Sequence, residues 1–172
     1  MGTTAMSDTA ALDPAGEDLA EVRAIIEDHR STPGAMLSLL HAVQGCLGWV
    51  PGRLVPEIAE TLGRSRAEVQ GVLDFYHDFR RAPPGRHVVQ ICRAESCRAM
   101  GSEALEAQAR ASLGIDLHET SPDGALTLEP VYCLGNCACS PAIRVDDEIH
   151  GRMDPAAFDA LICTLRGGET GA

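Results

Sequence analysis

The sequence predicts an α+β fold in which an N-terminal four-helix bundle precedes a smaller domain of strands and helices. Apolar residues recur at helical spacing from about residue 17 to residue 80, whereas after residue 85 short β-type runs alternate with helical ones. The 172-residue chain is 45% hydrophobic but only 3% aromatic, which favours helices and short strands over an aromatic-rich β-sandwich.

Four helices are expected in the N-terminal domain, at residues 17–80. Their apolar positions are Leu19, Val22, Ile25 and Ile26, then Met36, Leu40, Val43 and Leu47, then Leu54, Ile58 and Leu62, then Val69, Val72, Leu73 and Tyr76. Thr32 before Pro33 is a typical helix start, and Ser65 with Glu68 has the spacing of a capping box. The second and fourth helices are therefore expected to begin near these residues.

Changes in composition predict the domain limits. Residues 1–16 show no sustained apolar period, so we expect a mobile leader there. Residues 81–85, Arg-Ala-Pro-Pro-Gly, break the helical pattern and predict a linker. The second domain is then expected at residues 86–166, followed by a short tail at 167–172.

The second domain is expected to have the order strand, helix, strand, strand, helix. The expected elements are a strand at 87–91, a helix at 99–113, strands at 125–132 and 142–145, a hairpin closed near His150-Gly151, and a helix capped by Asp154-Pro155. Cys92 directly follows the first strand, and Cys133 directly follows the second. Two cysteine-bearing loops are therefore predicted at strand ends.

Four of the seven cysteines form two pairs, Cys92 with Cys97 and Cys133 with Cys137. In a reducing compartment such clustering indicates metal binding or redox chemistry more often than a disulfide framework. An iron–sulfur cluster requires soft thiolates that converge from loops whose backbone amides can hydrogen-bond the sulfurs. The four cysteines are therefore candidate ligands of one [2Fe–2S] cluster.

Other uses of these cysteines remain open from spacing alone. A four-thiolate zinc site in an interaction module is one, although zinc knuckles usually place two residues between paired cysteines rather than four and three. A dithiol oxidoreductase is another, but the sequence contains no C-x-x-C. Plant-type ferredoxins are excluded because their C-x₄-C-x₂-C spacing is missing.

The residues around the pairs have predicted secondary roles. Cys139 could replace Cys137 as the fourth ligand, but is expected near the cluster without binding it. Cys46 and Cys163 are expected to be ordinary buried thiols. Arg93 and Arg98 flank the first pair, where their positive charges would either favour an additional electron on the cluster or face a partner protein.

Charge and motifs exclude several functions. The formal net charge is -11, with 25 acidic and 14 basic side chains, which would repel nucleic acid and an anionic membrane surface. No run approaches the roughly 20 apolar residues of a membrane helix, so a cytoplasmic protein without direct membrane binding is expected. No G-x-G-x-x-G, P-loop or Ser/His/Asp arrangement occurs, so we expect no turnover by the isolated chain.

Two segments resemble the cluster loops of the thioredoxin-like [2Fe–2S] ferredoxin family. They are I-C-R-A-E-S-C-R-A-M-G at 91–101 and V-Y-C-L-G-N-C-A-C-S-P-A at 131–142. Residues 40–44 and 48–51 are similar to the family's helical part, so that the resemblance covers roughly residues 20–166. It implies a thioredoxin-like α/β domain with a small mixed sheet, and a cluster held by its C-x₄-C and C-x₃-C cysteines.

Within that family, residues 75–80, 92–95 and 150–152 look closer to the γ subunit of NAD-dependent formate dehydrogenase. This implies a molybdenum-dependent enzyme in which the cluster exchanges single electrons with the flavin of an NAD-binding subunit. FMN, NAD, further Fe–S clusters and a molybdenum cofactor would then lie on partner subunits. The alternatives are the 24 kDa-type subunit of NADH:quinone oxidoreductase and the equivalent subunit of an NAD-linked hydrogenase.

Overall fold

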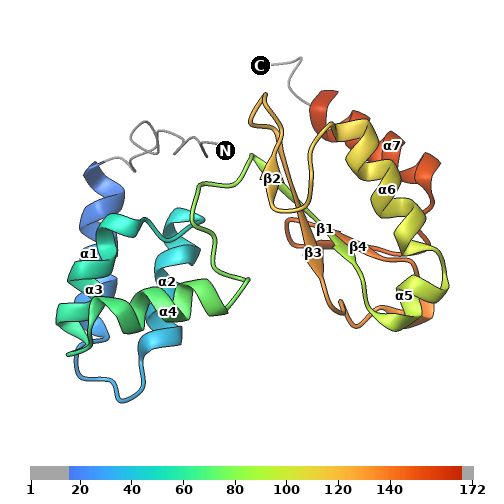
Figure 1. Ribbon diagram of the computed structural model, residues 1–172. Coiled ribbons are helices and arrows are strands. Elements are labelled where there is room, and N and C mark those ends of the chain that lie inside the picture. The colour runs from blue at the N-terminus through green and yellow to red at the C-terminus, as the bar shows by residue number, and fades with distance from the viewer. Residues whose placement is uncertain (1–15, 168–172) are drawn as a thin grey trace, which may run out of the picture. The chain divides into compact units, whose positions relative to one another are not determined.

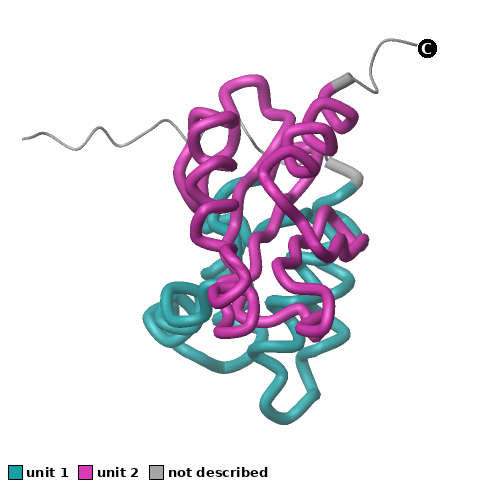
Figure 2. Tube along the Cα trace, turned by 90° about the vertical axis from the view of Figure 1, so that its right-hand side faces the viewer, with its two compact units in different colours: residues 1–83 teal, residues 84–172 magenta. Residues whose placement is uncertain are grey.

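The structure is a computed structural model that describes residues 16–167. Apart from Gly16 and Gly167, the leader predicted at 1–16 and the tail predicted at 167–172 lie outside the described residues. The chain divides into two compact units, residues 1–83 and 84–172 (Figure 2). Each unit is described by itself.

The first unit is all-helical, as predicted (Figure 1). Its elements are α1 (Gly16–Asp28), α2 (Met36–Leu47), the short 3₁₀ helix η2 (Gly52–Leu54), α3 (Val55–Thr61) and α4 (Arg66–Phe75). The apolar positions predicted from helical spacing supply most of its core, which includes Val22, Ile26, Leu40, Val43, Ile58, Val69 and Leu73. Burial of this shared apolar face stabilises helices that would be marginal alone.

Of the two helix starts predicted in this unit, only one is confirmed. Ser65 and Glu68 form a capping box: the Ser65 hydroxyl accepts from the Glu68 amide at 3.2 Å, and the Glu68 carboxylate accepts from the Ser65 amide at 2.8 Å. The start predicted at Thr32-Pro33 is wrong, because α2 begins at Met36 with no side-chain cap. Gly34 has a φ of +70° and interrupts right-handed geometry, so the helix can begin only after it.

The second unit contains a five-stranded mixed sheet in the order β2-β3-β1-β4-β5. Its strands are β1 (His87–Cys92), β2 (Glu119–Thr120), β3 (Leu126–Val131), β4 (Ile143–Val145) and β5 (Glu148–His150). Strands β1 and β3 are parallel, whereas β4 is antiparallel to both β1 and β5. The predicted hairpin is thus confirmed, while β2 is too short to leave a periodic signal.

Three helices complete the second unit: α5 (Glu95–Ala99), α6 (Ser102–Leu113) and α7 (Pro155–Gly167). The helix predicted at 99–113 corresponds to α6, which begins only at Ser102 because Gly101 before it adopts a φ of +98°. Helix α5 was not predicted. Helices α6 and α7 lie on the same side of the sheet (Figure 1). The shared core includes Val89, Ile91, Leu105, Leu126, Leu128, Ile143 and Phe158.

The sheet register determines where the cysteine loops lie. Cys92, the last residue of β1, pairs with Val131, the last residue of parallel β3. The loop after β3 therefore leaves the sheet beside the loop after β1. The chain then returns into β4 on the other side of β1, where the Ala142 carbonyl accepts a hydrogen bond from the Cys92 amide at 3.1 Å.

The capping box yields a first prediction. Ser65→Ala removes a hydrogen-bond acceptor from the first turn of α4 and should lower the stability of the helical unit by about 1 kcal/mol. Thr32→Ala, at the start that is not used, is the matched control and should change stability little. Urea unfolding of the full chain, followed by circular dichroism, measures both. Equal losses in the two variants would contradict the assigned cap.

Candidate metal centre

The four predicted ligands lie in two pairs at the same edge of the sheet. Cys92 ends β1 and Cys97 lies in α5, and the two thiols hydrogen-bond each other. Cys133 follows β3, and Cys137 begins the 3₁₀ helix η3 (Cys137–Cys139); their Sγ atoms are 4.0 Å apart. The structure thus brings together two pairs that lie far apart in the sequence.

The two pairs differ in exposure. Cys92 and Cys97 are each 2% exposed and pack with Ala142 in a small apolar cluster below the loops. Cys133 and Cys137 are exposed. A group held by all four sulfurs would therefore be anchored in the protein on one side and would reach the surface on the other.

The separation of the exposed thiols fits two thiolates on one tetrahedral metal ion, whether that ion is zinc or one iron of a cluster. Two thiolates on one tetrahedral metal ion, each about 2.3 Å from it, lie about 3.8 Å apart, which is close to the Cys133–Cys137 separation of 4.0 Å. Within residues 16–167, no three or more Cys, His, Asp or Glu side chains are gathered as ligands of one ion. Each iron of a [2Fe–2S] cluster takes two thiolates, so two separate pairs suit it.

Backbone amides surround the sulfurs, as a cluster of negative charge requires. The amides of Ala94 and Leu134, one from each loop, hydrogen-bond the Cys92 sulfur. The Gly135 amide donates to Cys133 Sγ at 3.3 Å. Gly135 has a φ of +75°, a conformation that glycine adopts without steric cost. The donor set is therefore suited to thiolates.

The buried thiols differ in acidity. Burial raises the pKa of the Cys92 thiol. Burial also opposes ionisation of Cys97, but hydrogen bonds from Ser140, Cys92 and the Ala142 amide outweigh it and lower the pKa of Cys97. Of this pair, Cys97 is therefore the more acidic thiol.

The two flanking arginines are neutralised rather than free. Arg93 Nε lies 3.0 Å from Glu106 Oε2, and Arg98 Nη2 lies 2.5 Å from Glu103 Oε1, with both carboxylates on α6. Their predicted effect on an additional electron is therefore offset by an adjacent negative charge. The sequence offered little sign of this, because Arg93 and Glu106 belong to different elements.

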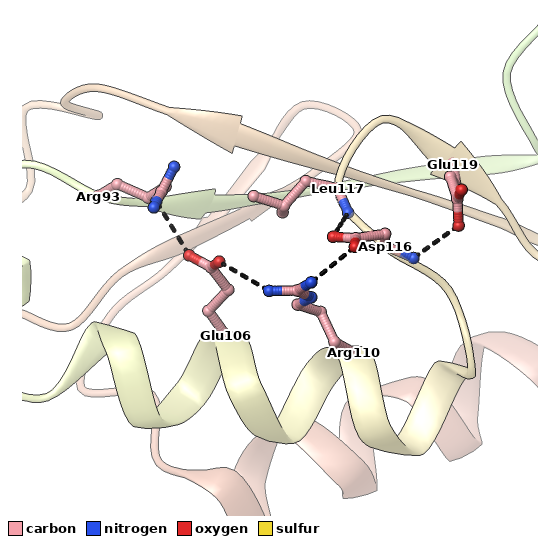
Figure 3. A network of polar contacts seen from close by, with 6 residues as sticks. All are labelled: Arg93, Glu106, Arg110, Asp116, Leu117 and Glu119. Carbon is pink, nitrogen blue, oxygen red and sulfur yellow. Dashed lines mark hydrogen bonds and ion pairs between the residues drawn. The ribbon is translucent and has the colours of Figure 1, made fainter.

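Arg93 is one end of a polar network that runs along α6 (Figure 3). Glu106 also lies 3.8 Å from Arg110, whose guanidinium is 2.6 Å from Asp116, and the Leu117 amide donates to Asp116 at 2.7 Å. The Glu106 side chain is only 11% exposed, so these contacts are screened less than surface ion pairs. The network holds the residue after Cys92 against α6.

The remaining cysteines are placed differently from one another. Cys139 is partly buried in η3, and its carbonyl accepts from the Arg152 amide at 2.6 Å. Cys46 is half-buried in α2. Cys163 is exposed, so its predicted burial is wrong: Phe158 and Ile162 occupy the buried face of α7.

Comparison with known proteins identifies the family. The model of the thioredoxin-like [2Fe–2S] ferredoxin family matches residues 22–166. The chain belongs to this family. Membership supports a [2Fe–2S] cluster as the cofactor of the site, in agreement with the paired sulfurs and their amide donors.

Curated relatives are named as subunits of NADH–quinone oxidoreductase. The relative from Pseudomonas aeruginosa is 41% identical over 136 residues, which are 79% of this chain and 80% of that protein. The relative from Rhizobium meliloti is 39% identical over 153 residues, 89% of each chain. The relative from Thermus thermophilus is 36% identical over 136 residues, 78% of this chain and 75% of that one.

A solved structure shares the fold. The air-oxidised NAD⁺-reducing [NiFe]-hydrogenase superposes with a TM-score of 0.66 and 24% identity over 83% of this chain. The matched region is 24% of the hydrogenase chain, so this protein spans about a quarter of that chain's length.

Gly151 provides a prediction about the second loop. A Cβ atom at this position would lie 2.6 Å from Cys139 Cβ and 2.8 Å from Asn136 Nδ2. Gly151→Ala should therefore displace the loop between Cys133 and Ser140 and lower stability by about 1–3 kcal/mol. The control Gly45→Ala lies inside α2 with nothing within 4 Å and should stabilise the chain by about 0.5–1 kcal/mol. Urea unfolding would contradict the packing if Gly151→Ala were neutral.

Proposed function

We propose that the chain holds one [2Fe–2S] cluster on Cys92, Cys97, Cys133 and Cys137 and serves as an electron-transfer subunit of an NAD-linked oxidoreductase. The observation that carries this proposal is the arrangement of two thiol pairs, one buried and one exposed, at the paired ends of β1 and β3. When bound, such a cluster supplies one-electron redox chemistry.

The exposed side of the site supports electron exchange with a partner. Cys133 and Cys137 lie at the surface, and the neighbouring Tyr132 is 68% exposed. Met100, next to the glycine that follows α5, is 62% exposed. Large apolar side chains beside a redox site are typical of a surface that another protein covers. The buried pair would meanwhile hold the cluster in place.

We propose a flavin- and NAD-binding subunit as that partner. The sequence contains no nucleotide-binding motif of its own, so FMN, NAD and further Fe–S clusters are assigned to partner subunits. The curated relatives are subunits of NADH–quinone oxidoreductase, and the solved structure with the same fold is an NAD⁺-reducing hydrogenase. An NADH:quinone oxidoreductase, or an enzyme related to it, is therefore the first candidate for the parent complex.

A molybdenum-dependent formate dehydrogenase is the second candidate. It rests on the short resemblances at residues 75–80, 92–95 and 150–152, of which the last contacts the second cysteine loop through Arg152 and Cys139. The relatives favour the first candidate, because their similarity covers most of the chain at 36–41% identity. A molybdenum cofactor on a partner belongs only to this second candidate.

We predict from net charge and hydropathy that the protein is cytoplasmic, does not bind a membrane directly and does not bind nucleic acid. Among residues 16–167, no helix is long and apolar enough to cross a membrane.

Ligand substitutions test the cluster. Anaerobically purified chain should be brown, contain about two iron and two sulfide per molecule, and show an electron paramagnetic resonance (EPR) signal on reduction. Serine at any one of Cys92, Cys97, Cys133 or Cys137 should remove most of the iron or strongly alter the signal. Cys139→Ser and Cys163→Ser are matched controls that should keep both. Colourless protein with one zinc, or loss of the cluster in Cys139→Ser, would contradict the ligand assignment.

Co-purification tests the parent complex. A tagged chain isolated from its own cells should bring down a flavoprotein together with NADH-dependent reductase activity. NADH:quinone oxidoreductase activity without formate-dependent NAD reduction is the expected outcome. Formate-dependent NAD reduction with molybdenum in the complex would select the second candidate, and recovery of the chain without any flavoprotein would contradict both.

A further inference from the structure

Two serine hydroxyls next to Cys97 link the two cysteine loops by hydrogen bonds. Ser140, only 9% exposed, places its Oγ 3.5 Å from Cys97 Sγ and 2.9 Å from the Cys137 carbonyl oxygen. Ser96, from α5, places its own Oγ 2.9 Å from Ser140 Oγ and 3.3 Å from the same carbonyl. Both hydroxyls therefore contact the Cys137 carbonyl, whereas Ser140 alone also contacts the Cys97 sulfur.

Which of these side chains donates a hydrogen bond and which accepts one depends on whether Cys97 is a thiol or a thiolate. As a free thiol, Cys97 can donate to Ser140, and the Ser140 proton is then directed to the Cys137 carbonyl. As a metal-bound thiolate, Cys97 has no proton and can only accept. Ser140 can then donate to the sulfur, while Ser96 donates to the Cys137 carbonyl and keeps it satisfied.

We infer that Ser140 donates a hydrogen bond to the Cys97 thiolate in the cluster-bound protein and thereby makes the cluster easier to reduce, with Ser96 as the positioning residue. This inference rests on the proposed function, because it assumes that Cys97 is a cluster ligand. It is based on the short distance between Ser140 Oγ and Cys97 Sγ. It is also based on Ser96, which can donate to the Cys137 carbonyl when Ser140 no longer does.

The direction of the effect follows from charge. One-electron reduction adds one negative charge to the cluster and its thiolates, so a hydrogen-bond donor to sulfur stabilises the reduced form more than the oxidised form. The effect is strengthened by burial, because Cys97 is 2% exposed and water competes little for the sulfur.

Ser140→Ala tests the inference in the cluster-loaded full chain. The ratio of reduced to oxidised cluster at a fixed potential should fall by about three- to tenfold, and tenfold corresponds to 59 mV for a one-electron couple. EPR-monitored redox titration measures the shift. Electron–nuclear double resonance after a brief exposure to D₂O, before the slower backbone amides exchange, should show a hydroxyl deuteron near the cluster in the natural protein, and this coupling should be lost in Ser140→Ala.

Further variants distinguish an effect of the Ser140 hydroxyl on the reduction potential from a general effect of removing a serine side chain. Ser140→Thr keeps the hydroxyl and should retain the potential. Ser96→Ala should give a smaller fall, and the Ser96→Ala/Ser140→Ala pair should match Ser140→Ala alone, since Ser96 acts through Ser140. Ser112→Ala removes a hydroxyl from α6 that bonds to the Ala109 carbonyl, away from the cysteine loops, and should leave the potential unchanged.

The outcomes distinguish this inference from the proposed function. An unchanged potential in iron-replete Ser140→Ala, or an equal fall in Ser112→Ala, would overturn the role of Ser140. If Ser140→Ala failed to hold the cluster, absence from the natural protein of the deuteron coupling that appears on brief exposure to D₂O, before the backbone amides exchange, would still overturn it. Absence of any [2Fe–2S] signal in the natural protein would instead reject the proposed function itself.

Discussion

The parallel pairing of β1 with β3 is the constraint on which the site depends. Cys92 lies opposite Val131, so the chain leaves both strands at the same edge and the two cysteine loops begin side by side. The antiparallel return through β4 brings Ser140 and Ala142 back to the same place. Without the crossover through α6, which parallel pairing requires, the second loop would emerge at the opposite end of the sheet.

The difference in exposure between the two thiol pairs follows from this architecture. Cys92 and Cys97 are buried and pack against Ala142, whereas Cys133 and Cys137 are exposed in the loop between β3 and β4. An electron carrier must protect its cofactor and also allow a partner to approach it. A site with a buried side and an exposed side meets both requirements, while a purely structural zinc site needs only the first.

Charge near the site is balanced at short range. The guanidinium groups of Arg93 and Arg98, which in isolation would favour an additional electron, are each paired with a carboxylate of α6. Electrostatic support for the proposed negative cluster would therefore come mainly from neutral donors, namely the amides of Ala94, Leu134 and Gly135 and the hydroxyl of Ser140. Neutral dipoles held by the backbone need no counter-charge and change little with ionic strength.

The ligand candidates, the helical periods and the placement of both loops at strand ends could be predicted from the sequence, because thiol chemistry, apolar spacing and strand length are local properties. The sequence missed the break at Gly101, the late start of α2 after Gly34 and the exposure of Cys163. The contacts of Arg93 with Glu106 and of Ser140 with Cys97, 43 positions away, became visible only in the folded chain. Such contacts depend on sheet register and helix packing, which bring together residues that no local pattern relates.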